Sequence, residues 1–342
     1  MNALTKITII IPTHERSSYL KRSLDYWSKI SVRVLVVDSS INIFSEKLSS
    51  NINYYHYPQL SFINKLNKIL KKVKTNYAAF CPDDDFITVT GLLKTVDFLE
   101  SNDEYVAAHG LYCSFKRKED KYYWYMSNYK YLSLEHNDPI ERLTFHFSNY
   151  RLPTFYAVHR TNALCYIISC AQKYTSDARF SELLPSLITV IHGKIQILDI
   201  FYGAREIIVN SASNKEKTIK EFIFEGTYNQ KYKYFRDGLA NELIKMAIVK
   251  SKVEAFKYID NGMNTYLKNK LNNTNFKTII FLQWLKIILN TMGLMKLVRY
   301  IKNHINFPTR ANKNIFTKFI FSDPNYSQYD DWFRINRTIH KI

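Results

Sequence analysis

The first hundred residues alternate between short, continuous apolar runs and longer segments in which apolar residues recur with helical spacing. Continuous runs are typical of strands buried on both faces of a parallel sheet. They lie at residues 7–11, 32–37, 52–57, 77–81 and 105–108. The clearest helical stripe follows the third run and consists of Phe62, Ile63, Leu66, Ile69, Leu70 and Val73. Repeated strand–helix–strand units predict a mostly parallel α/β sheet with helices on both faces.

The pattern changes after about residue 110. Residues 116–121 form a charged turn between aromatic residues, which predicts a hairpin or a loop. Two further strands are predicted at 155–159 and 195–200, and two helices at 161–173 and 179–192. Beyond these segments helical spacing dominates. We therefore expect an α/β domain over 1–215 and a basic, mainly helical extension over 216–342.

Composition narrows the class of protein. The chain is 46% hydrophobic and 15% aromatic, which is ample material for packed cores and excludes disorder as the dominant state. Its four cysteines form no C-x-x-C pair, so a zinc ribbon and a thioredoxin-type site are excluded. The apolar run at the N-terminus is too short for a signal peptide, and no uncharged run is long enough to span a membrane. We expect a cytoplasmic protein with reduced thiols.

Positive charge is concentrated in the second region. The net charge is +18, and residues 216–342 hold 22 Lys and Arg against 10 Asp and Glu. Residues 261–322 contain no acidic residue and mix Lys and Arg with Trp, Phe, Ile and Leu. This composition predicts peripheral contact with an anionic membrane at its inner face. A helical accessory domain with solvated lysines is the alternative, and nucleic-acid binding is a less favoured explanation because no nucleic-acid module occurs.

Polar residues follow three of the predicted strands. Pro12 to Arg16 end the first strand, Asp38 ends the second, and Asp83, Asp84 and Asp85 end the fourth. Ligands of open α/β sheets bind outside the carboxyl ends of strands, so these residues predict one shared crevice. Neighbouring carboxylates suit Mg²⁺ or Mn²⁺. The alternative is a solvent-facing acidic turn that caps a helix starting near Thr88.

Glycine-rich phosphate motifs are missing from the crevice. No G-x-G-x-x-G and no G-x-x-x-x-G-K-[ST] occurs anywhere in the chain. NAD-dependent redox chemistry and P-loop ATPase activity are therefore disfavoured.

The order and spacing of these segments resemble the family 2 glycosyltransferases with a GT-A fold. The matching residues are the strand 7–11 leading into Pro12-Thr13-His14-Glu15-Arg16, then Val36-Val37-Asp38-Ser39-Ser40, then Phe80-Cys81-Pro82-Asp83-Asp84-Asp85. The family pattern is an apolar strand into Pro-Thr-Tyr-Asn-Arg, a Val-Val-Asp-Asp/Ser strand end, and a D-x-D motif about forty-five residues later. The resemblance covers about residues 5–110 and extends more weakly to about 210. It implies a Rossmann-like GT-A sheet that binds a nucleotide-diphospho-sugar.

The resemblance also implies roles for individual residues. It assigns the nucleotide pocket to Pro12, Thr13, His14, Arg16, Asp38 and Asp83. Asp85 is implied as the metal-binding member of the D-x-D pair. Asp84 replaces it if the register shifts by one, since Pro82 stands where many members have an Asp. His14 and Glu15 stand where Tyr and Asn are usual, so the base contact is expected to differ.

An inverting transferase also needs a general base for the acceptor hydroxyl. In the family this base is an acidic residue about a hundred positions after the D-x-D motif, at the start of a helix. Glu182 is the first candidate and Asp177 the second, and an ordinary acid at a helix N-terminus is the alternative for both. If neither Glu182 nor Asp177 is the base, a retaining mechanism is the alternative.

The sequence thus predicts a metal-dependent, inverting glycosyltransferase of the surface-polysaccharide type. Its partners would be a nucleotide-sugar donor and a glycan or lipid-linked acceptor. The competing hypotheses are a nucleotidyltransferase or phosphotransferase of related topology, and a non-catalytic basic protein that binds membranes or nucleic acid.

Overall fold

The computed structural model describes residues 3–118, 121–126, 132–150, 152–175, 178–208, 228–273 and 327–340. Two predictions fall largely or wholly outside these ranges. Asp177 lies in a gap, and of the basic stretch 261–322 only residues 261–273 are described.

One nine-stranded sheet organises the described residues, in the order β3-β2-β1-β4-β8-β6-β9-β5 with β7 paired to β6. Its strands are β1 Ile7–Thr13, β2 Arg33–Asp38, β3 Ile52–His56, β4 Tyr77–Phe80, β5 Phe86–Ile87, β6 Tyr105–Lys118, β7 Lys121–Met126, β8 Val158–Arg160 and β9 Lys194–Glu206. The block β3-β2-β1-β4 is entirely parallel, and β6 pairs with β9 in parallel. The short strand β8 is antiparallel to both β4 and β6.

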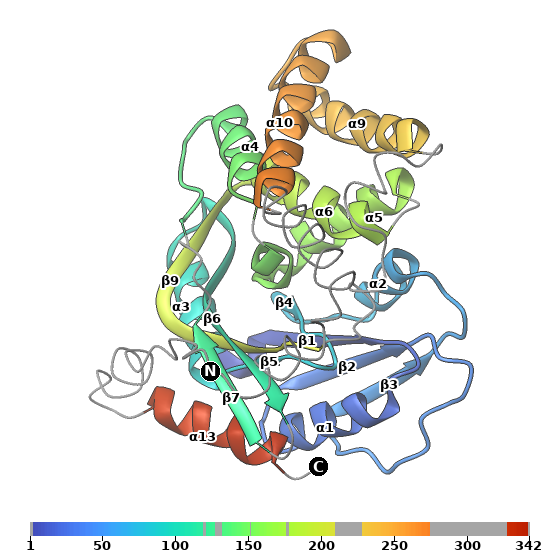
Figure 1. Cartoon of the computed structure of the whole chain (residues 1–342), viewed down its shortest axis with the longest axis vertical. Helices are drawn as coiled ribbons and strands as arrows, with labels where there is room; N and C mark the ends of the chain where they lie inside the picture. The colour runs from blue at the N-terminus through green and yellow to red at the C-terminus, as the bar shows by residue number, and fades with distance from the viewer. Residues whose placement is uncertain are drawn as a thin grey trace, which may run out of the picture.

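Helices cover both faces of the sheet, as predicted (Figure 1). They are α1 Ser17–Trp27, α2 Phe62–Leu70, α3 Val89–Ser101, α4 Pro139–Ser148, α5 Thr161–Tyr174, α6 Ala178–His192, α9 Tyr228–Lys245, α10 Lys252–Asn273 and α13 Ser327–Ile339, with 3-10 turns at η1 Ala3–Lys6 and η2 Leu152–Tyr156. Figure 1 shows α1 and α13 below the sheet and α2, α5 and α6 above it.

Two hydrophobic cores follow from strands that are buried on both faces. Along β1, Ile10 packs into the core above the sheet, whereas Ile9 and Ile11 pack into the core below it. Side chains alternate between the faces of a strand, so a continuous apolar run is what a central strand between two helix layers requires. The predicted mostly parallel α/β sheet with helices on both faces is confirmed.

The later elements match the predictions less evenly. The predicted hairpin is confirmed as β6 and β7, but β6 runs from Tyr105 to Lys118, far beyond the predicted strand 105–108. The strand predicted at 155–159 is wrong in its first half. Residues 152–156 form η2, because backbone pairing to β4 and β6 begins only near Val158. The short strand β5 was not predicted, since Phe86 and Ile87 are too few to show a period.

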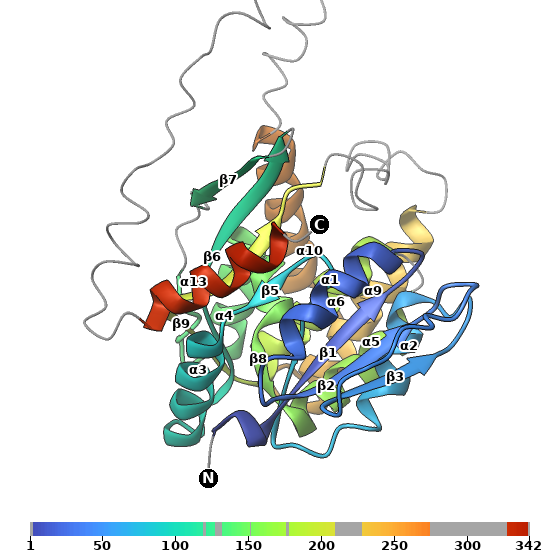
Figure 2. The same cartoon turned by 90° about the horizontal axis from the view of Figure 1, so that it is seen from below.

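Helices from the C-terminal region share both cores with the α/β domain. Leu239 of α9 and Ile259 of α10 pack in the core above the sheet, and Ile335 of α13 packs in the core below it. The α13 side chain Asp331 accepts hydrogen bonds from the backbone N–H groups of Val89 (3.0 Å) and Thr90 (2.9 Å), so it caps the start of α3 across 242 and 241 residues. Figures 1 and 2 both show α13 beside α1. The boundary at residue 215 stays a prediction.

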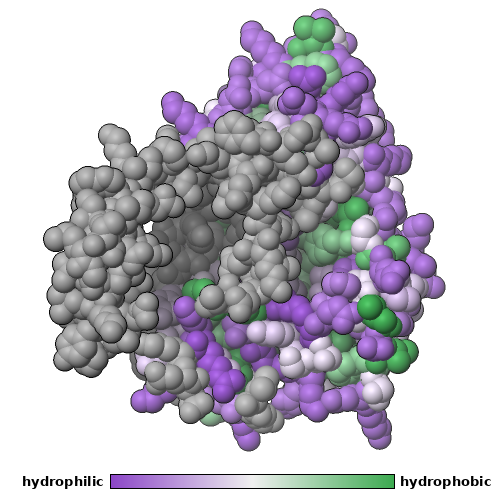
Figure 3. Space-filling view, turned by 45° about the vertical axis from the view of Figure 1, so that its right-hand side comes forward, coloured by the Kyte–Doolittle hydropathy of each residue, from purple (hydrophilic) through white to green (hydrophobic). Residues whose placement is uncertain are grey.

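The surface of the described part is largely polar. Figure 3 shows hydrophilic side chains over most of the described part of one face, with smaller hydrophobic patches between them. Among the described helices, none combines the length and the apolar character that crossing a bilayer requires.

Two buried histidines lie on the paired strands β6 and β8 in the middle of the sheet. His109 on β6 and His159 on β8 are at most 1% exposed, and their Nδ1–H groups donate to the carbonyl oxygens of Gly110 (2.7 Å) and Ala157 (2.8 Å). Burial lowers the pKa of each imidazole to about 4. Both rings therefore stay neutral in the folded protein at a pH where an unfolded chain already takes up protons.

These histidines predict acid destabilisation. Their stabilising contribution is complete above pH 6.5, the ordinary pKa, and is lost as the pH falls toward 4, by about 1.4 kcal/mol per pH unit for each ring. We expect the free energy of unfolding of the wild type to fall more steeply between pH 6.5 and 4.5 than that of His159→Gln, measured by urea titration. The difference between the two proteins is the readout because Asp83 and Asp85, with raised pKa values, titrate in the same window with the opposite sign. Identical slopes would contradict this assignment.

Candidate active site

The ends of β1, β2 and β4 meet at one edge of the sheet, as predicted. Thr13 lies opposite Asp38 in the parallel register of β1 and β2, and β4 pairs with β1 on the other side. The hydroxyl of Thr13 donates to Asp83 Oδ2 at 2.6 Å, across 70 residues of sequence. The first and fourth strand ends therefore touch directly, and the second lies beside them.

Arg16 joins the first strand end to the aspartate triplet. Its Nη1 lies 3.0 Å from Asp83 Oδ1, and its Nη2 donates to Asp84 Oδ2 at 2.7 Å. The guanidinium also lies over the ring of Tyr19, at 4.4 Å. Arg16 can turn toward this edge because the backbone reverses at Glu15, which has a φ of +52°.

The loop after β2 closes the other side of the crevice. Asp38 Oδ1 accepts from the backbone N–H of Ser40 (2.7 Å), and its Oδ2 accepts from the hydroxyl of Tyr54 (2.7 Å). His14 is exposed, and its Nδ1 lies 3.1 Å from the carbonyl oxygen of Ser39. Pro12 is buried within β1. Asp38 is therefore held rigidly at the rim, 3% exposed.

A second cluster surrounds Asp85. Its Oδ2 accepts from Arg205 Nε at 3.1 Å, and its Oδ1 accepts from the backbone N–H of Glu206 at 3.2 Å. Glu206 in turn pairs with the buried Arg22. Burial lowers the pKa of Arg205, but Asp85 together with Tyr156, Tyr112 and Glu182 outweighs this effect and raises the pKa above its ordinary value, so the guanidinium remains charged.

Glu182 lies near this cluster and contacts Tyr156. It sits in the first turns of α6, half-buried, and its Oε1 accepts from the hydroxyl of Tyr156 at 2.5 Å. The Arg205 guanidinium lies 5.4 Å from the centre of the Tyr156 ring. The predicted base and the predicted metal ligand are thus linked through Tyr156 and Arg205.

The sequence around this edge of the sheet matches a known protein family. Residues 8–158, which contain the ends of β1, β2 and β4, match the sequence model described as glycosyl transferase family 2. Residues 8–158 therefore carry the sequence pattern of the family 2 glycosyltransferases. The resemblance inferred from the strand ends is confirmed over these residues, and the match supports glycosyltransferase as the enzyme class.

Several solved structures of the S. aureus protein TarS are similar to this chain. TarS 1–349 in complex with UDP-GlcNAc aligns with a TM-score of 0.42 and 14% identity, over 79% of this chain and 92% of that chain. The complex of the same fragment with UDP gives 0.41 and 15% over the same shares. A longer TarS structure gives 0.40 and 12%, and the match covers 77% of this chain but only 54% of TarS. A comparison with curated proteins found no match.

The aspartate triplet of the family 2 domain is not a solvent-facing turn. Side-chain exposure is 2% for Asp83, 15% for Asp84 and 7% for Asp85. The helix after it is capped without the triplet, since the Thr88 hydroxyl accepts from the N–H of Gly91. The alternative of an acidic capping turn is therefore wrong.

Burial also governs the protonation of the triplet. Burial, reinforced by the charge of Asp84, raises the pKa of Asp83 to about 7. Burial likewise raises the pKa of Asp85 to about 7, against the opposing charge of Arg205. Among the described residues, no three His, Cys, Asp or Glu side chains are grouped so as to hold a metal ion.

Sequence reasoning missed Lys65 of α2. Its Nζ donates to the carbonyl oxygen of Thr13 (2.6 Å) and to Ser39 Oγ (3.2 Å), so it ties the ends of β1 and β2 together. Burial lowers its pKa to about 8, despite the nearby charges of Asp83 and Asp38. A signal existed in the sequence: Lys65 lies three residues after Phe62 and four before Ile69, inside an otherwise apolar helical stripe.

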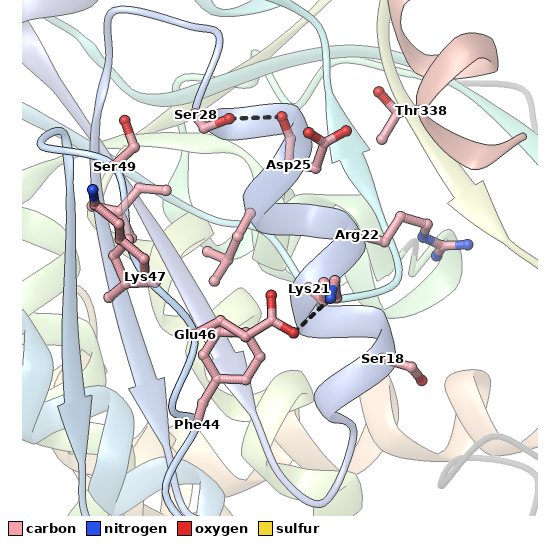
Figure 4. Close-up of a pocket in the computed structure, with 13 residues that line it drawn as sticks. Ser18, Lys21, Arg22, Asp25, Ser28, Phe44, Glu46, Lys47, Ser49 and Thr338 are labelled. Atoms are coloured by element: carbon pink, nitrogen blue, oxygen red, sulfur yellow. Dashed lines mark hydrogen bonds and ion pairs between the residues drawn. The ribbon is translucent and has the colours of Figure 1, made fainter. Parts of the chain in front are cut away.

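A cavity of about 520 Å³ lies beside this site, against the outer face of α1 (Figure 4). It is lined by Ser18, Lys21, Arg22, Leu24, Asp25, Ser28, Phe44, Glu46, Lys47, Leu48, Ser49, Ile52 and Thr338. Lys21 and Glu46 form an ion pair across it, at 2.6 Å. Arg22 is the one lining residue that also belongs to the cluster around Asp85, so the cavity is a neighbour of the site.

Proposed function

We propose that this protein transfers a sugar from a nucleotide-activated donor to a hydroxyl group of a glycan or lipid-linked acceptor, with inversion at the anomeric carbon. The observation that carries the proposal is the contact between Thr13 and Asp83 within the family 2 domain. This contact supports a single nucleotide pocket at the ends of β1, β2 and β4. In that pocket Pro12, Thr13, His14, Arg16, Asp38 and Asp83 would hold the nucleotide.

The reaction is a direct displacement. The acceptor oxygen forms a bond to the anomeric carbon while the bond from that carbon to the phosphate oxygen breaks, and its electron pair leaves with the diphosphate. Glu182 takes the proton of the acceptor hydroxyl. The hydrogen bond from Tyr156 supports this role, because it holds the Glu182 carboxylate in one orientation. Asp177, the second candidate, lies outside the described residues.

A divalent cation is part of the proposal. Asp84 and Asp85 offer hard oxygen ligands of the kind that Mg²⁺ and Mn²⁺ prefer. Asp84 is the most exposed of the three aspartates, and Asp85 would have to share its charge between the cation and Arg205. When bound, the cation would neutralise charge on the departing diphosphate.

The positive charge of the C-terminal region supports a proposal for the acceptor and for the cellular location of the enzyme. The stretch 261–322, without a single acidic residue, supports contact with the anionic inner face of a membrane, where a lipid-linked glycan would be presented. This placement suits an enzyme of surface polysaccharide biosynthesis in the cytoplasm.

Titration calorimetry with UDP, GDP and CMP, each with and without Mn²⁺, tests the proposed function. We expect one nucleoside diphosphate to bind in the micromolar range, more tightly with Mn²⁺ than with EDTA. A screen of donors by product mass spectrometry then identifies the sugar. If none of the three nucleotides binds and RNA binds with a steep salt dependence, the nucleic-acid hypothesis replaces this one.

A further inference from the structure

We propose that Arg205 binds the donor phosphate that is attached to the sugar and holds the diphosphate as it leaves. The inference rests on the proposed function and extends it to a residue of β9 that lies outside the family 2 segment 8–158. It assigns to the positively charged Arg205 side chain a role at the sugar–phosphate bond that breaks.

Arg205 differs from the structural arginines of this protein in how its nitrogens are used. Arg142 donates from all three nitrogens to backbone carbonyl oxygens, and Arg160 donates from Nε and Nη2 to three carbonyl oxygens. Arg16 gives both terminal nitrogens to carboxylates. In the described part of the chain, Arg205 makes one hydrogen bond, from Nε to Asp85.

Among the described residues, neither terminal nitrogen of Arg205 has a hydrogen-bond partner. A guanidinium has five N–H donors, and four of them lie on these two nitrogens in a planar fork that matches two phosphate oxygens. The Arg205 side chain is 25% exposed, whereas that of Arg22 is 3% exposed and paired with Glu206. A partly exposed guanidinium beside the strand ends is suited to an anionic ligand.

Neighbouring side chains hold the fork in one orientation. The guanidinium lies near the rings of Tyr112 (5.8 Å) and Tyr156 (5.4 Å), and its Nε is fixed by Asp85. Aromatic contacts of this kind favour a charged, planar group and reduce its freedom. Binding a phosphate would then cost little ordering of the side chain.

The position of Arg205 matches the geometry of a displacement. The base must lie on one side of the anomeric carbon and the leaving oxygen on the other. Arg205 contacts Asp85, a proposed cation ligand, and lies near the ring of Tyr156, whose hydroxyl donates to Glu182. As the carbon–oxygen bond breaks, negative charge grows on the phosphate oxygen, and a fixed cation beside it stabilises that charge.

Nucleotide binding tests this role without turnover. The probes are UDP with UMP and GDP with GMP, titrated by calorimetry in Mn²⁺ into the wild type, Arg205→Gln and Arg205→Lys. We expect Arg205→Gln to weaken the diphosphate by at least about tenfold and the monophosphate by less than about twofold. Arg205→Lys should recover part of the loss, because a lysine keeps the charge and loses the fork.

Controls separate this role from a structural one. Lys21→Gln removes an exposed charge from the neighbouring cavity and should leave both affinities unchanged. Circular dichroism and thermal unfolding of Arg205→Gln check the fold, and Mn²⁺ alone checks that Asp85 still binds the cation. Unchanged diphosphate affinity, or equal losses for diphosphate and monophosphate, would overturn the inference and leave the proposed function standing. Failure of the wild type to bind any of the four probes would instead overturn the proposed function itself.

Discussion

Glu182→Gln is expected to lower kcat by about 10²–10⁴-fold while the affinity for the nucleoside diphosphate stays within about twofold. A glutamine side chain has nearly the same shape and still accepts the hydrogen bond from Tyr156, but it cannot take a proton from the acceptor hydroxyl. The loss therefore falls on the chemical step. Initial rates at saturating donor and acceptor measure it, and calorimetry with the diphosphate measures the binding.

A matched control for this variant is Glu104→Gln, which removes an exposed carboxylate that pairs with Lys194 far from the crevice. Its rate should equal that of the wild type. The anomeric configuration of the product, read by NMR, provides a second criterion: an inverted product agrees with a base at Glu182. A variant with wild-type kcat, or a product with retained configuration, would assign the chemistry to another residue.

Asp85→Asn is expected to reduce turnover by at least about 10³-fold and to abolish Mn²⁺-dependent tightening of nucleotide binding. The amide keeps the volume of the carboxylate but loses the charge that a cation and Arg205 both require. The neutral change is preferable to alanine, because Asp85 is buried and its complete removal would leave Arg205 without its partner. We expect a cost of about 1–3 kcal/mol in stability, which leaves the protein folded.

The same measurement on Asp84→Asn decides the register of the D-x-D pair. If Asp84 carries the cation, its variant loses Mn²⁺ dependence and Asp85→Asn retains it. If both variants keep wild-type turnover and the same response to Mn²⁺, the metal site is refuted. Circular dichroism of each variant separates these outcomes from unfolding.

Much of the fold was predictable because its signals are local. The five apolar runs before residue 110 correspond to β1, β2, β3, β4 and the first part of β6. Strands between two helix layers must be apolar on both faces, so they consist of consecutive apolar residues. The register of β2, β1 and β4 then brings Thr13, Asp38 and Asp83 to one edge, so the proximity of these residues followed from topology alone.

Predictions failed where the environment of a residue comes from distant segments. The alternative of a solvent-facing triplet failed because Arg16, Arg205 and the backbone N–H of Glu206 contact its carboxylates. Lys65 is buried because the ends of β1 and β2 supply oxygen acceptors for its ammonium group. In each case the partner lies tens of residues away or more, and no periodicity reports it.

By itself, the amino-acid sequence determined the order of strands and helices and the acidic and basic residues that end β1, β2 and β4, since these depend on side-chain periods and on neighbours in the chain. Only the tertiary structure decided which charges meet. Asp85 accepts a hydrogen bond from Arg205, 120 residues later in the chain, and Val89 donates one to Asp331, 242 residues later. The physical reason is that a hydrogen bond or an ion pair depends on the distance between two groups in space. Separation along the chain does not determine that distance when strands from separate segments pair in one sheet.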